Sequence, residues 1–145
     1  MRGWLLDTNI VSAIGPEKRP LPPDTLAWIK TQTDMLYLPT ICVAEIEEGI
    51  FRLRRIGLAR RADRLRKWFD RILDDYADRM LSFDLHAARI AGPLSDAAKA
   101  AGRHPGFPDL AIATIAKSRD LVVATNNRRH FEPLGVAIFD PFAAH

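Results

Sequence analysis

Short apolar runs alternate along the chain with longer segments in which apolar residues recur about every 3.6 positions. The short runs are typical of buried strands, and they lie at residues 4–6, 35–38, 80–83, 121–124 and 136–139. The periodic segments are typical of helices, and they lie at residues 25–31, 44–56, 59–77, 84–102 and 108–117. Strands separated by helices usually form a parallel sheet with helices on both faces. The pattern therefore predicts an α/β fold, a three-layer α/β/α sandwich with a short, mainly parallel central sheet.

Proline and glycine residues mark the ends of these elements. The prolines between residues 16 and 23 indicate a loop, and Gly57 ends the helix that precedes it. Pro93 falls inside the helix predicted at 84–102 and is expected to kink or split it, because proline has no backbone N–H. Pro108 suits the first position of the next helix, where an N–H would have no partner in any case.

The composition limits the class of protein. The chain has 145 residues, 48% of them hydrophobic and 27% charged, which predicts one globular domain over residues 1–145. Its single cysteine, Cys42, excludes an internal disulfide and a cysteine-based zinc cluster, so a reducing, cytoplasmic setting is expected. No apolar stretch is long enough to span a bilayer, and Asp7 and Asn9 interrupt any signal-peptide core. We therefore expect no membrane partner.

Positive charge is concentrated in one segment. The whole chain carries a net charge of +3, yet residues 52–71 hold nine basic and two acidic residues, a net charge of +7, which leaves −4 for the rest. On the predicted helix at 59–77, basic residues recur at spacings of 4, 3 and 4 and share one face. Such a face suits a polyanion or a protein partner, and an ordinary solvated helix surface would look the same, so both interpretations stay open. The candidate contact residues are Arg52, Arg55, Arg60, Arg64, Lys67 and Arg71.

Three acids occupy positions where enzyme sites form. Asp7 ends the first predicted strand, Glu45 opens the helix after the second, and Asp109 opens a helix after a loop rich in glycine and proline. In open α/β sheets, sites gather beyond the carboxyl ends of the strands. Taken singly, each acid has an ordinary explanation as a helix cap or a surface charge. If the three converge, their repulsion favours a hard cation, Mg²⁺ or Mn²⁺, which can orient a phosphodiester and activate water.

Neighbouring polar groups suit a supporting role around such a site. The hydroxyls of Thr8 and Thr125 and the amide of Asn9 can orient carboxylates and water. Local capping explains Thr8 and Asn9 equally well. Cys42 lies in an apolar run and is interpreted as a core residue.

Several motifs, in order along nearly the whole chain, resemble those of a PIN domain and, more closely, those of VapC-type ribonuclease toxins. The motifs are Leu5-Leu6-Asp7-Thr8-Asn9, Thr40 through Glu45 with Gly49, Asp109-Leu110-Ala111-Ile112-Ala113, Ala124-Thr125-Asn126-Asn127 and Phe139-Asp140-Pro141-Phe142. The resemblance implies an α/β/α fold around a short parallel sheet and a Mg²⁺-dependent endoribonuclease site, with Mn²⁺ as a substitute ion. It also implies that Asp7, Glu45 and Asp109 are the metal-binding catalytic acids.

The same resemblance implies partners. The substrate would be RNA, either transfer RNA or ribosomal RNA. The positive charge of the segment 52–71, independently of the resemblance, predicts that its basic residues lie against the RNA backbone. Toxins of this kind usually form homodimers. They are encoded beside a small antitoxin that inserts a segment into or near the active site. The helices predicted at 44–56 and 59–77 correspond to the region that such an antitoxin commonly grips.

Two positions depart from the family pattern. Asn127 stands where many members have a fourth acid, and its neutral oxygen can hold a metal through a bound water without adding charge, which favours one ion over two. His130 stands where an aspartate is common, and it is either structural or RNA-facing. A catalytically weakened RNA- or protein-binding module on the same fold is therefore the alternative function. Phosphotransfer through an aspartate is less favoured, because no suitable lysine follows a later strand.

Overall fold

The structure is a computed structural model, and it describes residues 2–143. Five strands form one parallel sheet in the order β3-β2-β1-β4-β5. Their bounds are Trp4–Leu6 (β1), Leu36–Pro39 (β2), Met80–Leu81 (β3), Val122–Ala124 (β4) and Ile138–Phe139 (β5). The predicted α/β fold is confirmed, and each strand lies where an apolar run predicted it. The predicted domain also includes Met1, Ala144 and His145, which lie outside the described residues.

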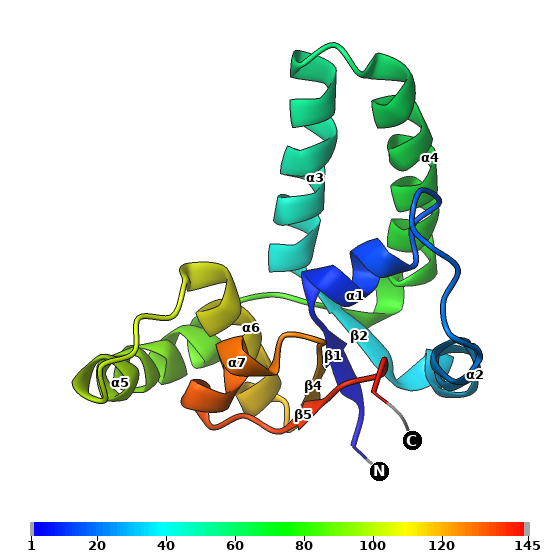
Figure 1. The fold of residues 1–145 in the computed structure, drawn as a ribbon. Helices are drawn as coiled ribbons and strands as arrows, with labels where there is room; N and C mark the ends of the chain where they lie inside the picture. The colour runs from blue at the N-terminus through cyan, green and yellow to red at the C-terminus, as the bar shows by residue number, and fades with distance from the viewer. Residues whose placement is uncertain (1, 144–145) are drawn as a thin grey trace.

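Helices connect the strands and cover both sides of the sheet. Their bounds are Thr8–Ala13 (α1), Pro23–Gln32 (α2), Thr40–Arg55 (α3), Ala59–Asp75 (α4), Leu85–Ala100 (α5), Phe107–Ser118 (α6) and Arg128–Phe131 (α7). Figure 1 shows α2 on one side of the strands and α5 and α6 on the other, while α3 and α4 form a hairpin that projects from the sheet. None of the helices within residues 2–143 has the length and apolar character that crossing a bilayer requires.

The helix α6 is the buried centre of the molecule. Its residues 110–116 are all buried, and it packs against β1 and β4, where Leu5 and Val123 are fully buried. Pro108 fits in its first turn because the first N–H groups of a helix have no partner inside it. Since α6 ends just before β4 begins, it runs back along the sheet, and its first turn lies at the carboxyl ends of the strands. This packing places Asp109 at that edge.

The α3–α4 hairpin has a small core of its own. Ile50, Ala62 and Phe69 are buried between the two helices, so the apolar stripe predicted for residues 59–77 faces α3. Gly57 makes the turn between them with a φ of +88°, a left-handed conformation that strains any residue with a Cβ. The turn therefore explains why the chain has a glycine where one helix ends and the next begins.

The structure corrects three details of the predicted elements. α3 begins at Thr40, directly after β2, and not at residue 44. α5 is not split at Pro93, because burial of Ala87 and Ala91 holds the helix against the core despite the missing N–H. The short helices α1 and α7 were not predicted, since each is too short to show an apolar period.

Candidate active site

The carboxyl edge of the sheet brings together acids that lie far apart in the sequence. Asp7 follows β1 and caps α1, and Glu45 lies in the second turn of α3, which starts at the end of β2. Asp109 is in the first turn of α6, and the charges of Asp109 and Glu45 both reach the Asp7 carboxyl. The three predicted acids therefore share one electrostatic environment.

Asp7 is deeply buried, with 5% of the residue exposed. Its Oδ1 accepts a hydrogen bond from the backbone N–H of Thr8 at 2.8 Å, and its Oδ2 accepts one from the Thr125 hydroxyl at 2.8 Å. The pKa of Asp7 is raised to about 6, first by burial and then by the charges of Asp109 and Glu45, although both hydrogen bonds act in the opposite direction. A cation at this edge would relieve both the burial penalty and the repulsion.

Thr8 connects Glu45 to the end of β1. Its hydroxyl donates to Oε1 of Glu45 at 2.6 Å, and the same hydroxyl oxygen lies 3.0 Å from Sγ of Cys42. The Cys42 thiol is fully buried and donates to the carbonyl of Leu6 at 3.4 Å. Burial raises the pKa of this thiol, so Cys42 is a neutral core residue, as its apolar surroundings predicted. Asn9, by contrast, is exposed.

Thr125 has a similar place on the other side of Asp7. While its hydroxyl donates to Asp7, its oxygen accepts the backbone N–H of Asn127 at 2.9 Å. Because the hydroxyl is fully buried and its proton is donated to Asp7, its orientation is fixed. Asn127 follows β4, the strand beside β1, so its side chain starts from the same edge of the sheet.

Asp109 pairs with a residue whose role the sequence left open. Nδ1 of His130 lies 3.0 Å from Oδ2 of Asp109. The pKa of Asp109 is raised, because the effect of burial exceeds the opposing effect of the neighbouring His130. His130 belongs to α7, which follows β4, so the rule that placed Asn127 at this edge could have placed His130 there as well.

The donor set suits a hard cation. Carboxylate oxygens, with the amide oxygen of Asn127 two residues beyond Thr125, are the ligands that Mg²⁺ and Mn²⁺ prefer. The structure supports a cation at Asp7, because the buried carboxylate of this residue faces two further negative charges. Within residues 2–143, no three His, Cys, Asp or Glu side chains stand close enough together to enclose a metal. The residues fit the ion by ligand chemistry and by charge, although the three acids do not form a closed set of ligands in this structure.

The predicted basic face lies along α4, in the hairpin that projects from the sheet (Figure 1). Part of its charge is neutralised by Glu17, from the loop after α1. Arg61 and Arg64 pair with its two carboxylate oxygens at 2.6 Å and 2.9 Å and lower the pKa of Glu17. All six candidate contact residues are exposed: Arg52, Arg55, Arg60, Arg64, Lys67 and Arg71.

Comparison with known proteins identifies the family. The family model of the PIN domain matches residues 4–135. The plasmid stability protein StbB of Pseudomonas syringae pv. tomato is 37% identical over 142 residues, which cover 97% of this chain and 99% of that protein. The VapC ribonuclease Y4jK of Sinorhizobium fredii is 34% identical, with 95% and 96% covered. The toxin FitB of Neisseria gonorrhoeae is 33% identical, with 95% and 97% covered.

Solved structures agree with the sequence comparison. The crystal structure of FitAcB from Neisseria gonorrhoeae matches with a TM-score of 0.83 and 33% identity, over 97% of this chain and 99% of that chain. DNA-bound VapBC from Salmonella typhimurium matches with a TM-score of 0.80 and 27% identity, over the same shares of the two chains. The similarity covers every element that carries a predicted acid. The chain therefore belongs to the PIN-domain family, in the group that includes VapC ribonucleases and the FitB toxin.

Proposed function

We propose that this protein is a metal-dependent endoribonuclease, and that it is the toxin of a toxin–antitoxin pair. The observation that carries the proposal is the environment of Asp7, a buried carboxyl that shares the carboxyl edge of the sheet with Glu45 and Asp109. A fold gains nothing in stability from crowding carboxylates in this way, whereas a cation-dependent site requires it. The names of the relatives, a VapC ribonuclease and a toxin, support the same activity.

The roles of the residues follow from their contacts. Asp7, Glu45 and Asp109 would hold Mg²⁺, or Mn²⁺ in its place, with Asn127 acting through a water. When bound, the ion would neutralise charge on the phosphodiester and lower the pKa of an attacking water. Thr8 holds Glu45 and Thr125 holds Asp7 by hydrogen bonds, so both carboxylates are oriented before RNA arrives.

The proposal includes partners. RNA is the substrate, a transfer RNA or a ribosomal RNA, in the cytoplasm. A cognate antitoxin is inferred because the structural relatives include FitAcB and VapBC, which are toxin–antitoxin complexes. Its binding region would be the exposed hairpin α3–α4. A homodimer is inferred from the family resemblance.

The test is cleavage of total cellular RNA by the purified protein, freed of any partner. Reactions contain Mg²⁺ or EDTA, and the variants are Asp7→Ala and a matched control, Asp63→Ala, on the exposed face of α4. Discrete fragments should require both Mg²⁺ and Asp7 and should persist in the control. Cleavage that survives EDTA or Asp7→Ala would contradict the proposal, and RNA binding without cleavage would support the binding-module alternative.

A further inference from the structure

Two adjoining hollows lie beside Asp109, next to α7. The larger has a volume of about 800 Å³ and the smaller about 440 Å³, and both are lined by Arg103, Arg129, His130 and Pro133. The smaller hollow is also lined by Asp109, one of the three acids. Because they share these walls, the two hollows form one continuous depression, here named the Arg103–Arg129 groove, which reaches Asp109.

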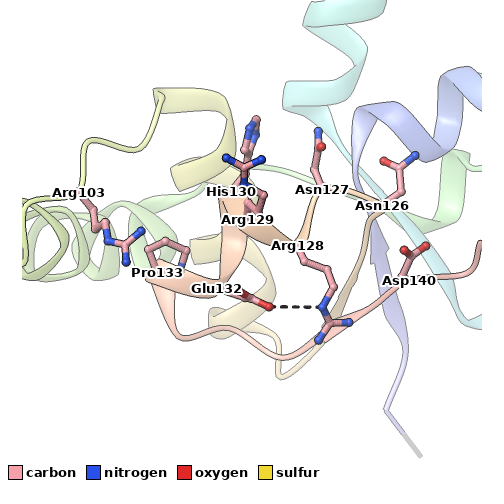
Figure 2. Close-up of a pocket in the computed structure, with 9 residues that line it drawn as sticks. All are labelled: Arg103, Asn126, Asn127, Arg128, Arg129, His130, Glu132, Pro133 and Asp140. Atoms are coloured by element: carbon pink, nitrogen blue, oxygen red, sulfur yellow. Dashed lines mark hydrogen bonds and ion pairs between the residues drawn. The ribbon is translucent and has the colours of Figure 1, made fainter. Parts of the chain in front are cut away.

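The walls of this groove come from separate parts of the chain. Arg103 extends toward it from the loop after α5, and Arg129 lies on α7 (Figure 2). Opposite Arg103 are Asn126, Asn127 and Asp140. Since the fold places arginine on one side and two amides with one carboxylate on the other, charged and hydrogen-bonding groups face the same space.

The two arginines of the groove differ from other basic residues at its edge. Arg128 pairs with Glu132 at 3.4 Å, and His130 pairs with Asp109 at 3.0 Å. Within the described part of the chain, no carboxylate lies in ion-pair distance of Arg103 or Arg129. Both side chains are exposed. They are therefore free to bind an anion that enters the groove.

A single-stranded RNA suits this groove better than a protein segment does. A guanidinium binds phosphate through parallel hydrogen bonds, and phosphate contacts supply most of the affinity of proteins for nucleic acid. The amides on the opposite wall both donate and accept hydrogen bonds, as the edges of unpaired bases require. The lining carries no large apolar side chain to anchor a protein segment.

We propose that Arg103 and Arg129 bind phosphates of single-stranded RNA next to the bond that is cleaved at Asp7, Glu45 and Asp109. The inference rests on the proposed function, because it assigns the path of the same substrate. It differs from the prediction drawn from charge density, which put the RNA backbone against residues 52–71.

The test measures binding apart from cleavage. A fluorescently labelled, mixed-sequence single-stranded RNA oligonucleotide is titrated in EDTA with the wild type and with the double variant Arg103→Gln/Arg129→Gln. The matched control, Arg19→Gln/Lys30→Gln, removes the same charge from two exposed positions that lie outside the groove and outside the candidate contact residues of the hairpin. The groove variant should bind about tenfold more weakly, and its plot of log affinity against log salt should flatten by about 1.4, or about 0.7 for each lost phosphate contact. The control should behave as the wild type.

Each other outcome counts against the groove. Equal losses in the two double variants would mean that only net charge matters. Wild-type RNA binding by the groove variant, together with loss of copurification with the protein encoded beside it, would assign the groove to that protein. In both cases, Mg²⁺-dependent cleavage by the wild type would leave the proposed function standing. A wild type that neither binds nor cuts RNA would overturn the function and the inference together.

Discussion

Two basic regions of this protein differ in the surroundings of their charges. On the α3–α4 hairpin, which includes the densest run of basic residues, four guanidiniums pair with nearby acids, as Arg54 does with Asp63 and Arg66 with Glu47, and the other basic side chains point to solvent. In the Arg103–Arg129 groove, two arginines separated in sequence have no carboxylate in ion-pair distance among residues 2–143, and they line a depression that reaches Asp109. Charge density along a sequence therefore indicates where basic residues are, whereas the partners that they find in the fold decide which are free to act.

The regions also differ in how they are stabilised. The hairpin is held by apolar contacts between two helices adjacent in sequence. The acidic edge is held by hydrogen bonds between distant segments, and it carries a buried carboxyl whose charged form is unfavourable. The apolar contacts of the hairpin stabilise the fold. The buried charge of Asp7 at the acidic edge destabilises it, at the place where the proposed site lies.

The largest expected effect on stability is in the hairpin. Phe69→Ala should lower the free energy of unfolding by about 3–5 kcal/mol, because Phe69 is fully buried and its removal leaves a cavity. Denaturant titration followed by circular dichroism measures the change. Phe51→Ala, on the exposed side of the same hairpin with 61% of the residue accessible, should alter it by less than about 0.5 kcal/mol. Similar losses in both variants would contradict the packing described.

A substitution at the acidic edge should raise the free energy of unfolding, which is the opposite of the effect expected for Phe69→Ala. The folded pKa of Asp7 is about 6 and the ordinary value is 3.8, so as pH rises through this window the unfolded chain ionises first and the wild type loses stability. Asp7→Asn, which does not ionise, should therefore be more stable by up to about 3 kcal/mol above pH 7. It should also abolish cleavage.

Unfolding curves of the wild type and Asp7→Asn, measured between pH 4 and pH 8, test whether the variant is the more stable protein. The gap between the two proteins should close near pH 4, where Asp7 is protonated in the folded protein and about half protonated in the unfolded chain. A variant less stable than the wild type at pH 8 would show that the hydrogen bonds of the carboxylate outweigh the cost of its burial.

Metal should stabilise the same edge. At a Mg²⁺ concentration about one hundred times the dissociation constant, binding linkage should add about 2.7 kcal/mol to the free energy of unfolding. Asp109→Asn should remove most of the resulting rise in melting temperature, and Asp63→Asn, on the hairpin, should keep it. Melting that does not depend on Mg²⁺ in the wild type would argue against a metal site here.

The smallest effect is expected at the surface ion pairs of the hairpin. Glu17→Gln releases Arg61 and Arg64, and it should cost less than about 1 kcal/mol because such pairs are screened by water. It should leave the rate of RNA cleavage unchanged, although it frees two guanidiniums. Faster cleavage would show that the hairpin charges serve the substrate and would weaken the contrast between the two regions.

The sequence predicted much of the fold because apolar periodicity reports burial directly. The strands and the helices α3 to α6 follow from it, and so does the position of Asp7 at a strand end. α1 and α7 were missed because helices of one or two turns show no apolar period, and their formation depends on the chain packing around β1 and β4.

The site was predicted in part. Acids at the ends of elements could be found from the sequence, whereas the contact of His130 with Asp109 depends on how α7 meets α6. The unpaired guanidiniums of Arg103 and Arg129 could not be found, because the sequence does not show which basic residues gain an acidic partner in the fold, as the adjacent Arg128 does with Glu132. The neutralising role of Glu17 was likewise hidden, since a loop brings it to α4 from more than forty residues away.

The position of β1 between β2 and β4 has a consequence for protein synthesis. The Asp7 carboxylate obtains one of its two hydrogen bonds from Thr125, 118 residues later in the chain, and β1 obtains a neighbouring strand from the same region. A growing chain therefore cannot complete this edge of the sheet until β4 and Thr125 have been synthesised. Chains released before that point lack the finished site, so only chains that extend past Thr125 could carry the proposed activity.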